Sequence, residues 1–491
     1  MLRCGRRGLR TSTAALAAVG LLAAAAPSWA HPTGNQVQVT GTTQQAIPAG
    51  FLGLSMSTTE MGNYASAPAF PRMVQAIHPY GGPFSLRIGG QTADRTVWAG
   101  AQRLIAPKFR IPGAYVVGPV WMHQLGELAA GTDSHVILDV STADHSPRAD
   151  RALTSAARRT LGSRLTGLAI GNEPDLYGIG LVGDDRHPGA WAYRYDPRSY
   201  ARQFADLAPA LQAAAPGVPL LGPETAYPSP RWSQTLLDAH LPVGELTVHT
   251  YPMLSCLKPG SFRYPTVAGF LSDSTLDFWT RKDERLEEIA HEDQLPLRIT
   301  ELGSAACRGI PGVTNTEATG LWVVNQLFSL AADGIIGVNV HVRAASISSA
   351  LQAPAGGPLR PKPLFYGMAL FARAVGLHAR LLSETHTPFH RLHVWTVASA
   401  LGLRTVAVNT GGRAQKLSLL APAHGSASTQ TLTAPTPRSS QATLAGQTLG
   451  SDGTWQGRPL TSRVSERDRT WTITVPADSA QIVSWAHAGG G

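Results

Sequence analysis

Apolar and polar positions between residues 47 and 375 alternate between two patterns. Short runs rich in Val, Ile and Leu are separated by longer segments with the apolar spacing of a helix. This alternation is typical of repeated β/α units around a parallel sheet. We expect eight strands, at Phe51–Ser55, Ser85–Ile88, Val136–Val140, Leu165–Ile170, Pro219–Gly222, Leu246–His249, Leu297–Glu301 and Gly334–Asn339. Eight such units predict an α/β fold, a closed (β/α)8 TIM barrel.

Two of the intervening helices have clear sequence signals. Asp196 followed by Pro197 combines a helix cap with a proline in the first turn, which predicts a helix start at this point. The segment Asp277–Glu292 is charged on one side and apolar on the other, which predicts an amphipathic helix.

The pattern changes near residue 376, where the chain becomes rich in Ser, Thr, Ala and Gly. Short stretches then alternate between apolar and polar positions, at Leu403–Val408, Lys416–Leu420, Trp471–Val475 and Gln481–Trp485. This alternation predicts a C-terminal antiparallel β-sandwich domain. The stretch Gly425–Gly457 forms either irregular strands or a loosely ordered excursion. Trp455, Trp471 and Trp485 could stack on sugars, although Trp in such strands is more often part of the core.

The predicted domain organisation has four parts. Residues 1–30 form an export signal, and residues 31–46 add one or two strands to the sandwich, because Asn35–Gln45 also alternates. Residues 47–375 form the barrel, and residues 376–491 form the β-sandwich domain.

The N-terminus has the features of a signal peptide. Four arginines within the first ten residues precede an apolar stretch, Ala14–Ala26, that is too short to span a bilayer. Ser28–Ala30 is a small-x-small cleavage signal, so we expect a mature chain starting near His31. Adjacent Arg6 and Arg7 leave twin-arginine export open beside general secretion. The protein is therefore expected to be secreted or periplasmic, without a membrane span.

Charge and cysteine content narrow the class of partner. The formal net charge falls from +9 to +5 once the four leader arginines are removed, and no basic run with interleaved aromatic residues is present. Nucleic acid is not expected as a partner, whereas an acidic polysaccharide is favoured. Cys256 and Cys307 are the cysteines that remain, and in an exported protein such a pair is more often a disulfide than a metal site. We expect a monomer.

Two carboxylates stand at the ends of predicted strands. Glu173 follows the fourth strand and Glu301 ends the seventh. In a barrel, both would lie at the C-terminal rim, where barrel chemistry takes place. A pair of carboxylates roughly 5 to 5.5 Å apart hydrolyses a glycosidic bond with retention of configuration. We therefore expect Glu173 to be the acid/base and Glu301 the nucleophile, with Asn172 bonded to a sugar hydroxyl and no metal or cofactor required.

Several motifs, taken in order, resemble glycoside hydrolase family 79. They are Ser85–Gly90, Gly171–Asp175, Val248–Pro252, Thr300–Glu301 with Gly309–Val313, and the barrel exit Lys362–Phe371. The resemblance covers most of the mature chain. Asn-Glu-Pro is shared by a wider clan of retaining barrels, whereas the block from Glu301 to Val313 and the barrel exit are typical of this family. The family contains exo-acting β-glucuronidases and heparanases, so the resemblance implies a β-glucuronidase acting on a uronate-containing glycan.

The resemblance also implies roles for residues around the two carboxylates. Tyr251 would donate a hydrogen bond near the nucleophile, and His249 would either line the same pocket or pack behind it. Arg87, Gly89 and Gly90 would bring the backbone close to the sugar, since glycine permits close approach.

One segment departs from the family pattern. Several members place a tyrosine and two glycines after the nucleophile to hold the uronate carboxylate, whereas this chain has Ala305–Gly309 there. Arg308, next to Gly309, is a candidate replacement because a guanidinium pairs with a carboxylate in two parallel hydrogen bonds. A Cys256–Cys307 disulfide would join two loops at the rim.

Three alternatives stay open at this point. One is a retaining barrel glycosidase of another specificity, such as a β-xylosidase, β-glucosidase or arabinofuranosidase. Another is an enzyme that cuts inside a chain, as heparanases do. The third is an inactive carbohydrate-binding protein, which would be expected to lack one of the two carboxylates.

Overall fold

The computed structural model of the 491-residue chain describes residues 35–107, 113–143, 146–179, 195–385, 389–421 and 425–485. The predicted export signal lies outside these residues. Within them, no helix combines the length and the apolar character that crossing a bilayer requires.

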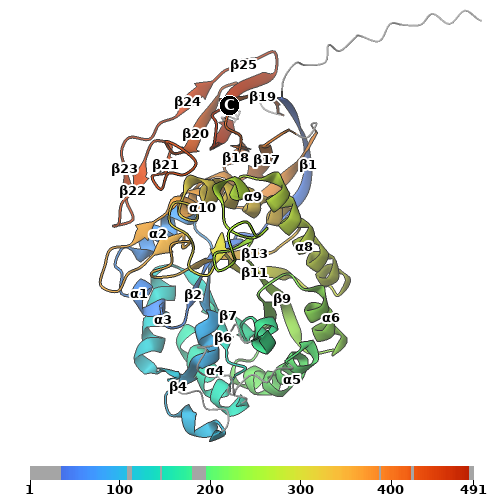
Figure 1. Ribbon diagram of the computed structural model, residues 1–491, viewed down its shortest axis with the longest axis vertical. Coiled ribbons are helices and arrows are strands. Elements are labelled where there is room, and N and C mark those ends of the chain that lie inside the picture. The colour runs from blue at the N-terminus through green and yellow to red at the C-terminus, as the bar shows by residue number, and fades with distance from the viewer. Residues whose placement is uncertain are drawn as a thin grey trace, which may run out of the picture. The chain divides into compact units, whose positions relative to one another are not determined.

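Eight parallel strands close into a barrel, and helices surround it (Figure 1). In chain order the strands are β2 (Leu52–Ser57), β3 (Phe84–Gly89), β6 (Ser134–Val140), β7 (Leu165–Ile170), β8 (Leu220–Thr225), β9 (Val243–Thr250), β11 (Leu297–Leu302) and β13 (Gly337–Val342). β2, β3 and β8 are buried along their whole length, as is typical of parallel strands covered on both faces. The predicted TIM barrel is confirmed, and each predicted strand overlaps an observed one.

The helices include both of those that the sequence predicts. They are α1 (Met61–Ala65), α2 (Phe70–Ile77), α3 (Pro119–Gly131), α4 (Pro147–Leu161), α5 (Pro197–Ala214), α6 (Pro230–Asp238), α7 (Val267–Phe270), α8 (Asp273–Glu292), α9 (Glu317–Ala332) and α10 (Pro363–Val375). Asp196 caps α5, because its carboxylate accepts a hydrogen bond from the Ser199 backbone at 2.8 Å. The predicted amphipathic segment Asp277–Glu292 lies within α8.

The remaining long strands form one sheet of eleven strands, called here the curled sheet. Its strands are β1 (Asn35–Ile47), β16 (Ala379–Thr385), β17 (Leu392–Ser399), β18 (Gly402–Asn409), β19 (Gln415–Leu420), β20 (Ala427–Thr433), β21 (Thr443–Leu444), β24 (Ser462–Val464), β25 (Glu466–Arg467), β26 (Thr470–Val475) and β27 (Ser479–Trp485). All pairs are antiparallel except β1 with β19. Strands from different parts of the sheet share one apolar core, so the predicted sandwich is confirmed as a sheet curled around its own core.

The segment Gly425–Gly457 forms short, irregular strands. Besides β20 and β21, it contains β22 (Thr448–Leu449) and β23 (Trp455–Gln456), which pair with each other. Trp471 and Trp485 lie in the core of the curled sheet with their rings 5.9 Å apart, as the core interpretation predicts.

The curled sheet packs against two barrel helices, α9 and α10. Phe328 of α9 stacks on Trp395 of β17 with ring centroids 5.8 Å apart, and Arg404 of β18 donates a hydrogen bond to the Arg373 carbonyl of α10 at 2.7 Å. These contacts attach the sheet to the helices that follow the seventh and eighth barrel strands. The domain boundaries at residues 46/47 and 375/376 stay a prediction.

Candidate active site

A cavity of about 380 Å³ opens at the C-terminal ends of the barrel strands. Its size falls within the range of about 300 to 1,000 Å³ that is usual for small-molecule sites. Among the residues that line it are Asn172, Glu173, Tyr251, Glu301, Arg308, His341 and Arg343. Both predicted carboxylates therefore face one cavity, and the lining residues all precede the curled sheet's strands β16 to β27 in sequence.

Glu301 lies within β11, the seventh barrel strand, and its side chain is 6% exposed. The carboxylate accepts hydrogen bonds from the Arg87 guanidinium and from the Tyr251 hydroxyl, the latter at 2.5 Å. Burial would raise the pKa of Glu301, but the cations His249 and Arg87 and the hydrogen bond from Tyr251 outweigh burial and hold the pKa well below its usual range. Glu301 is therefore an ionised carboxylate at ordinary pH, as a nucleophile must be.

Tyr251 follows β9 and acts as a hydrogen-bond donor. Burial and the nearby charges of Glu301 and Glu173 hold the pKa of Tyr251 well above its usual range. The phenol therefore keeps its proton and donates a hydrogen bond to Glu301.

Glu173 stands just beyond β7, the fourth barrel strand, where Pro174 begins the 3-10 helix η5 (Pro174–Ile179). Its φ of 49° lies in the left-handed region, which is uncommon for a residue other than glycine. One carboxylate oxygen lies 3.1 Å from His249 Nδ1. Single ligand atoms of Glu173, His249 and Glu301 all lie within 4.8 Å of one another. A left-handed φ such as that of Glu173 is a form of backbone strain that is typical of functional positions.

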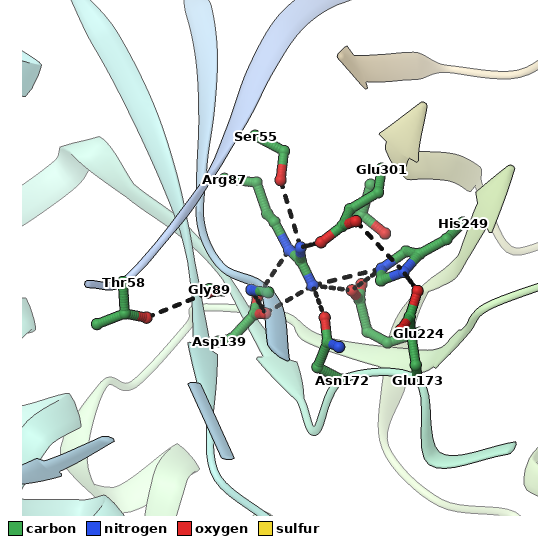
Figure 2. Close-up of polar contacts among 12 residues, drawn as sticks. Ser55, Thr58, Arg87, Gly89, Asp139, Asn172, Glu173, Glu224, His249 and Glu301 are labelled. Atoms are coloured by element: carbon green, nitrogen blue, oxygen red, sulfur yellow. Dashed lines mark hydrogen bonds and ion pairs between the residues drawn. The ribbon is translucent and has the colours of Figure 1, made fainter. Parts of the chain in front are cut away.

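Arg87 is completely buried and connects the site (Figure 2). Its guanidinium pairs with Asp139 at 2.6 Å, with Glu224 at 2.7 Å and with Glu301, and it donates a hydrogen bond to the Asn172 side chain at 2.9 Å. A buried charge requires such pairing, because desolvation of an isolated ion is very unfavourable. Arg87 thus joins the third, fourth, fifth and seventh strand ends into one charged network.

His249 of β9 lies between two carboxylates and is completely buried. Its Nδ1 faces Glu173 at 3.1 Å, and its Nε2 faces Glu224 at 2.9 Å (Figure 2). Burial would lower the pKa of His249, but the charge of Glu301 and the hydrogen bonds to Glu173 and Glu224 raise it to about 10. The ring is therefore an imidazolium that donates from both nitrogens.

Five of the predicted binding residues, Gly90 among them, do not line the cavity. Arg87 and His249 lie behind the lining carboxylates and contact those carboxylates instead. At Gly89, an added Cβ would lie 1.8 Å from Asp139 Oδ2, and at Gly309 it would lie 2.4 Å from Thr314 Oγ1. Of the two alternatives for His249, the structure has the one in which it packs behind the pocket, and Arg87 lies behind the lining carboxylates with it. Sugar contacts of Gly89 and Gly309 stay a prediction.

Gly90 also lies outside the lining, but it approaches Glu301 closely. An added Cβ at Gly90 would lie 3.4 Å from Glu301 Oε1, and its φ of 68° favours glycine. Its backbone N–H donates to Asp139 at 3.0 Å.

Four residues of the site were missed by the sequence analysis. Asp139 is a charged residue inside a predicted strand, and Glu224 stands two residues beyond another predicted strand, and both features were available signals. His341 and Arg343 were hidden because the eighth strand was placed three residues too early. Gly334, with φ 85°, turns the chain after α9, and β13 begins at Gly337.

His341 lies against Glu301. Its Nδ1 is 3.1 Å from the Ser55 hydroxyl and 3.6 Å from Glu301 Oε1. Burial lowers the pKa of His341 to about 4, so the ring is neutral at ordinary pH.

The predicted disulfide is confirmed, since Cys256 and Cys307 are bonded to each other. Both cysteines line the cavity. Cys307 and Arg308 have left-handed φ values of 62° and 70°, and the Arg308 carbonyl accepts a hydrogen bond from the Ile347 N–H at 2.9 Å. The disulfide and this hydrogen bond hold the Arg308 loop at the edge of the cavity.

Glu173, His249 and Glu301 are also close enough to reach a single metal ion. An imidazolium, however, has no lone pair to offer a metal. The guanidinium of Arg87 on Glu301 adds a second positive charge next to the same point. The charge distribution therefore fits a hydrogen-bonded network better than a cation site.

No protein-family model matches the sequence, and no curated protein matches it. Solved structures do resemble it. A 4-O-α-L-rhamnosyl-β-D-glucuronidase from Fusarium oxysporum has 18% identity and a TM-score of 0.74, covering 91% of this chain and all of its own. A family 51 arabinofuranosidase from Xanthomonas axonopodis has 13% identity and a TM-score of 0.62; the match covers 92% of this chain and 99% of the arabinofuranosidase.

A family 30 endoxylanase from Clostridium papyrosolvens has 14% identity and a TM-score of 0.55; the match covers 92% of this chain and 100% of the endoxylanase. At such identities the likeness shows the fold. The protein has the fold of barrel glycoside hydrolases with a C-terminal β-sandwich domain. Membership of family 79 stays a prediction.

Proposed function

We propose that the protein is a retaining glycoside hydrolase. The observation that carries this proposal is the proximity of Glu173 and Glu301, whose nearest carboxylate oxygens lie within 4.8 Å at the cavity. Retaining enzymes hold the two carboxyl groups roughly 5 to 5.5 Å apart, whereas inverting enzymes leave about 6.5 to 9.5 Å for a water molecule. The short separation supports direct attack by one carboxylate on the anomeric carbon.

The roles follow from the surroundings of each carboxylate. Glu301, ionised and oriented by Arg87 and Tyr251, attacks the anomeric carbon and forms a glycosyl ester. Glu173 gives its proton to the glycosidic oxygen as the bond to the leaving alcohol breaks. Water then attacks the ester, Glu173 takes up a proton from that water, and Glu301 is released as a carboxylate.

The proposed substrate is a glycan with a terminal β-linked glucuronic acid. Arg308 and Arg343 both line the cavity, and within the described part of the chain neither guanidinium forms an ion pair. A guanidinium without an acidic partner favours a ligand with a carboxylate. The motifs shared with family 79 and the likeness to a β-D-glucuronidase support the same substrate class. The disulfide supports a secreted or periplasmic location.

Release of the aryl group from an aryl β-glucuronide tests this function directly. We expect the purified protein to turn over the β-glucuronide and not the matching β-glucoside, β-xyloside or α-arabinofuranoside. Glu173→Gln should lower kcat/KM roughly 100- to 10,000-fold for a leaving group that needs protonation, and Glu301→Gln should abolish turnover. Glu245→Gln is the matched control, because Glu245 is a buried carboxylate paired with Arg298 and does not line the cavity.

The same assay separates mechanism from specificity. Arg343→Gln should lower kcat/KM for the glucuronide roughly 10- to 100-fold, as expected for loss of a charged hydrogen bond, while exposed Arg360→Gln should not. Turnover of a neutral glycoside alone would keep the retaining mechanism and overturn the uronide specificity. No turnover of any aryl glycoside would contradict the proposed function and favour a binding protein or an enzyme that cuts inside chains.

A further inference from the structure

A carboxylate outside the predicted pair, Glu224, reaches the proposed acid/base through an imidazole. Glu224 Oε2 lies 2.9 Å from His249 Nε2, and His249 Nδ1 lies 3.1 Å from Glu173 Oε1 (Figure 2). The side chains of Glu224 and His249 are completely inaccessible to solvent, whereas that of Glu173 is 16% exposed. Only the last member of this three-residue chain can therefore touch a ligand in the cavity.

The backbone supplies a second, independent link between the same two glutamates. The Glu173 N–H donates to the Glu224 carbonyl at 2.8 Å. Both residues have left-handed φ values, 49° for Glu173 and 55° for Glu224. Two adjacent strand ends thus adopt the same uncommon conformation and bind to each other, which fixes where the Glu173 side chain begins. Strain stored at both positions is a sign of a functional constraint rather than of ordinary packing.

Charged groups face His249 from every neighbouring strand end. They are Arg87 on β3, Asp139 on β6, Glu173 and Asp175 after β7, Glu224 on β8, Glu301 on β11 and His341 on β13. Arg87 Nη2 lies 3.3 Å from the ring and disfavours its protonation, whereas Glu224 binds both cations and compensates for their repulsion. Without the Glu224 charge, two cations would be in contact with one carboxylate fewer between them.

We propose that Glu224 is a positioning residue for the acid/base: it keeps His249 as an imidazolium against Glu173, which stabilises the carboxylate that Glu173 becomes when it protonates the leaving oxygen. The inference rests on the proposed glycosidase function and adds a residue to it. During the step, the proton of Glu173 moves to the glycosidic oxygen, the bond from that oxygen to the anomeric carbon breaks, and His249 donates to the new carboxylate without losing its own protons. Glu224 itself exchanges no proton.

Glu224→Gln tests the inference because it keeps the shape and removes the charge. A leaving group that needs protonation depends on Glu173, whereas an activated one does not. We expect kcat/KM for phenyl β-glucuronide to fall about 10- to 100-fold and that for the 2,4-dinitrophenyl glycoside to fall less than about threefold. Glu173→Gln should show the same dependence on the leaving group, and Glu245→Gln should show none.

An equal fall for both leaving groups would overturn the inference, because Glu224 would then act through Arg87 and the nucleophile or through folding alone. If the protein turns over no aryl glycoside, the protonation state of His249 can still be measured. In protein labelled with ¹⁵N-histidine, with His249 assigned by His249→Gln, both ring nitrogens should stay protonated through about pH 8 and lose this in Glu224→Gln. A neutral ring in the unaltered protein would overturn the inference. Absence of aryl glycosidase activity with an imidazolium still present would instead contradict the proposed function.

Discussion

The mouth of the barrel and the core of the curled sheet bury very different side chains. At the mouth, Arg87, Asp139, Glu224 and His249 form one charged network behind Glu301, which lines the cavity. The core of the curled sheet consists of Val, Leu, Ile and Ala with two tryptophans. Apolar burial stabilises a fold, whereas a buried ion pair is weak evidence of stability and is common where chemistry takes place. The difference assigns chemistry to the mouth and support to the curled sheet.

The two regions also differ in backbone conformation. Glu173 and Glu224 at the mouth occupy left-handed conformations and point their side chains at one histidine. The sheet strands β17 and β18 pair without interruption over Leu392–Ser399 and Gly402–Asn409. Left-handed residues also occur around the curled sheet, for example Asp468, Arg469 and Asp478, but these lie in turns between strands. At the mouth, by contrast, two such residues direct their side chains at one buried group.

Arg87→Met should give the largest effect, since it tests whether charge holds the mouth together. The change leaves Asp139, Glu224 and Glu301 buried without their common cation. We expect the free energy of unfolding to fall by about 3 to 5 kcal/mol and kcat/KM to fall at least about 100-fold. Chemical denaturation and the aryl glycoside assay measure the two quantities.

Arg298→Met is the matched control for Arg87→Met. Arg298 lies on β11, the strand that contains Glu301, and pairs with Glu245 at 2.6 Å. It should lose stability while kcat/KM of the folded protein stays unchanged. If Arg87→Met kept full activity, the charged network at the mouth would serve stability rather than chemistry, as the core of the curled sheet does.

Trp471→Ala should weaken the fold without changing the chemistry. Trp471 is completely buried in the core of the curled sheet, and its Nε1–H donates to the Gly425 carbonyl at 3.0 Å. We expect the free energy of unfolding to fall by about 3 to 5 kcal/mol, as for other large core truncations. Kinetics on folded protein should give an unchanged KM. A raised KM together with unaltered stability would show instead that the curled sheet takes part in substrate binding.

The sequence predicts the barrel well because its signals are local. Each buried strand is a short apolar run, and Glu173 and Glu301 end two of these runs with recognisable neighbours. The curled sheet follows from the alternation of apolar and polar positions, as in Thr470–Val475, where every second residue is buried. Such patterns depend only on neighbouring residues and on which side of an element is buried.

The charged network behind the carboxylates could not be predicted in the same way. Glu224 and Asp139 matter through contacts with Arg87, which is 137 and 52 residues away along the chain. The apolar strands next to both residues signal that they lie at strand ends, but nothing near either residue identifies Arg87 as the partner. His341 and Arg343 were missed for a different reason. The eighth strand was predicted three residues too early, so its predicted C-terminal end fell before these two residues.

The smallest predicted effect concerns Asp333, which tests whether a buried acid away from the mouth is a defect without function. Asp333 ends α9, where a negative charge is unfavourable, and burial together with Glu284 and Glu287 raises its pKa to about 7. Because this pKa lies above that of the unfolded chain, the associated stability is complete below about pH 4 and is lost as the pH rises through 7. Asp333→Asn should therefore increase the free energy of unfolding by about 1 kcal/mol at pH 8 and by almost nothing at pH 4, with activity unchanged. Exposed Asp293→Asn, at the end of α8, should give a smaller gain in the same denaturation series. Loss of activity in Asp333→Asn would mean that buried acids outside the mouth also serve the reaction, so the division between a chemical mouth and a supporting remainder would not hold.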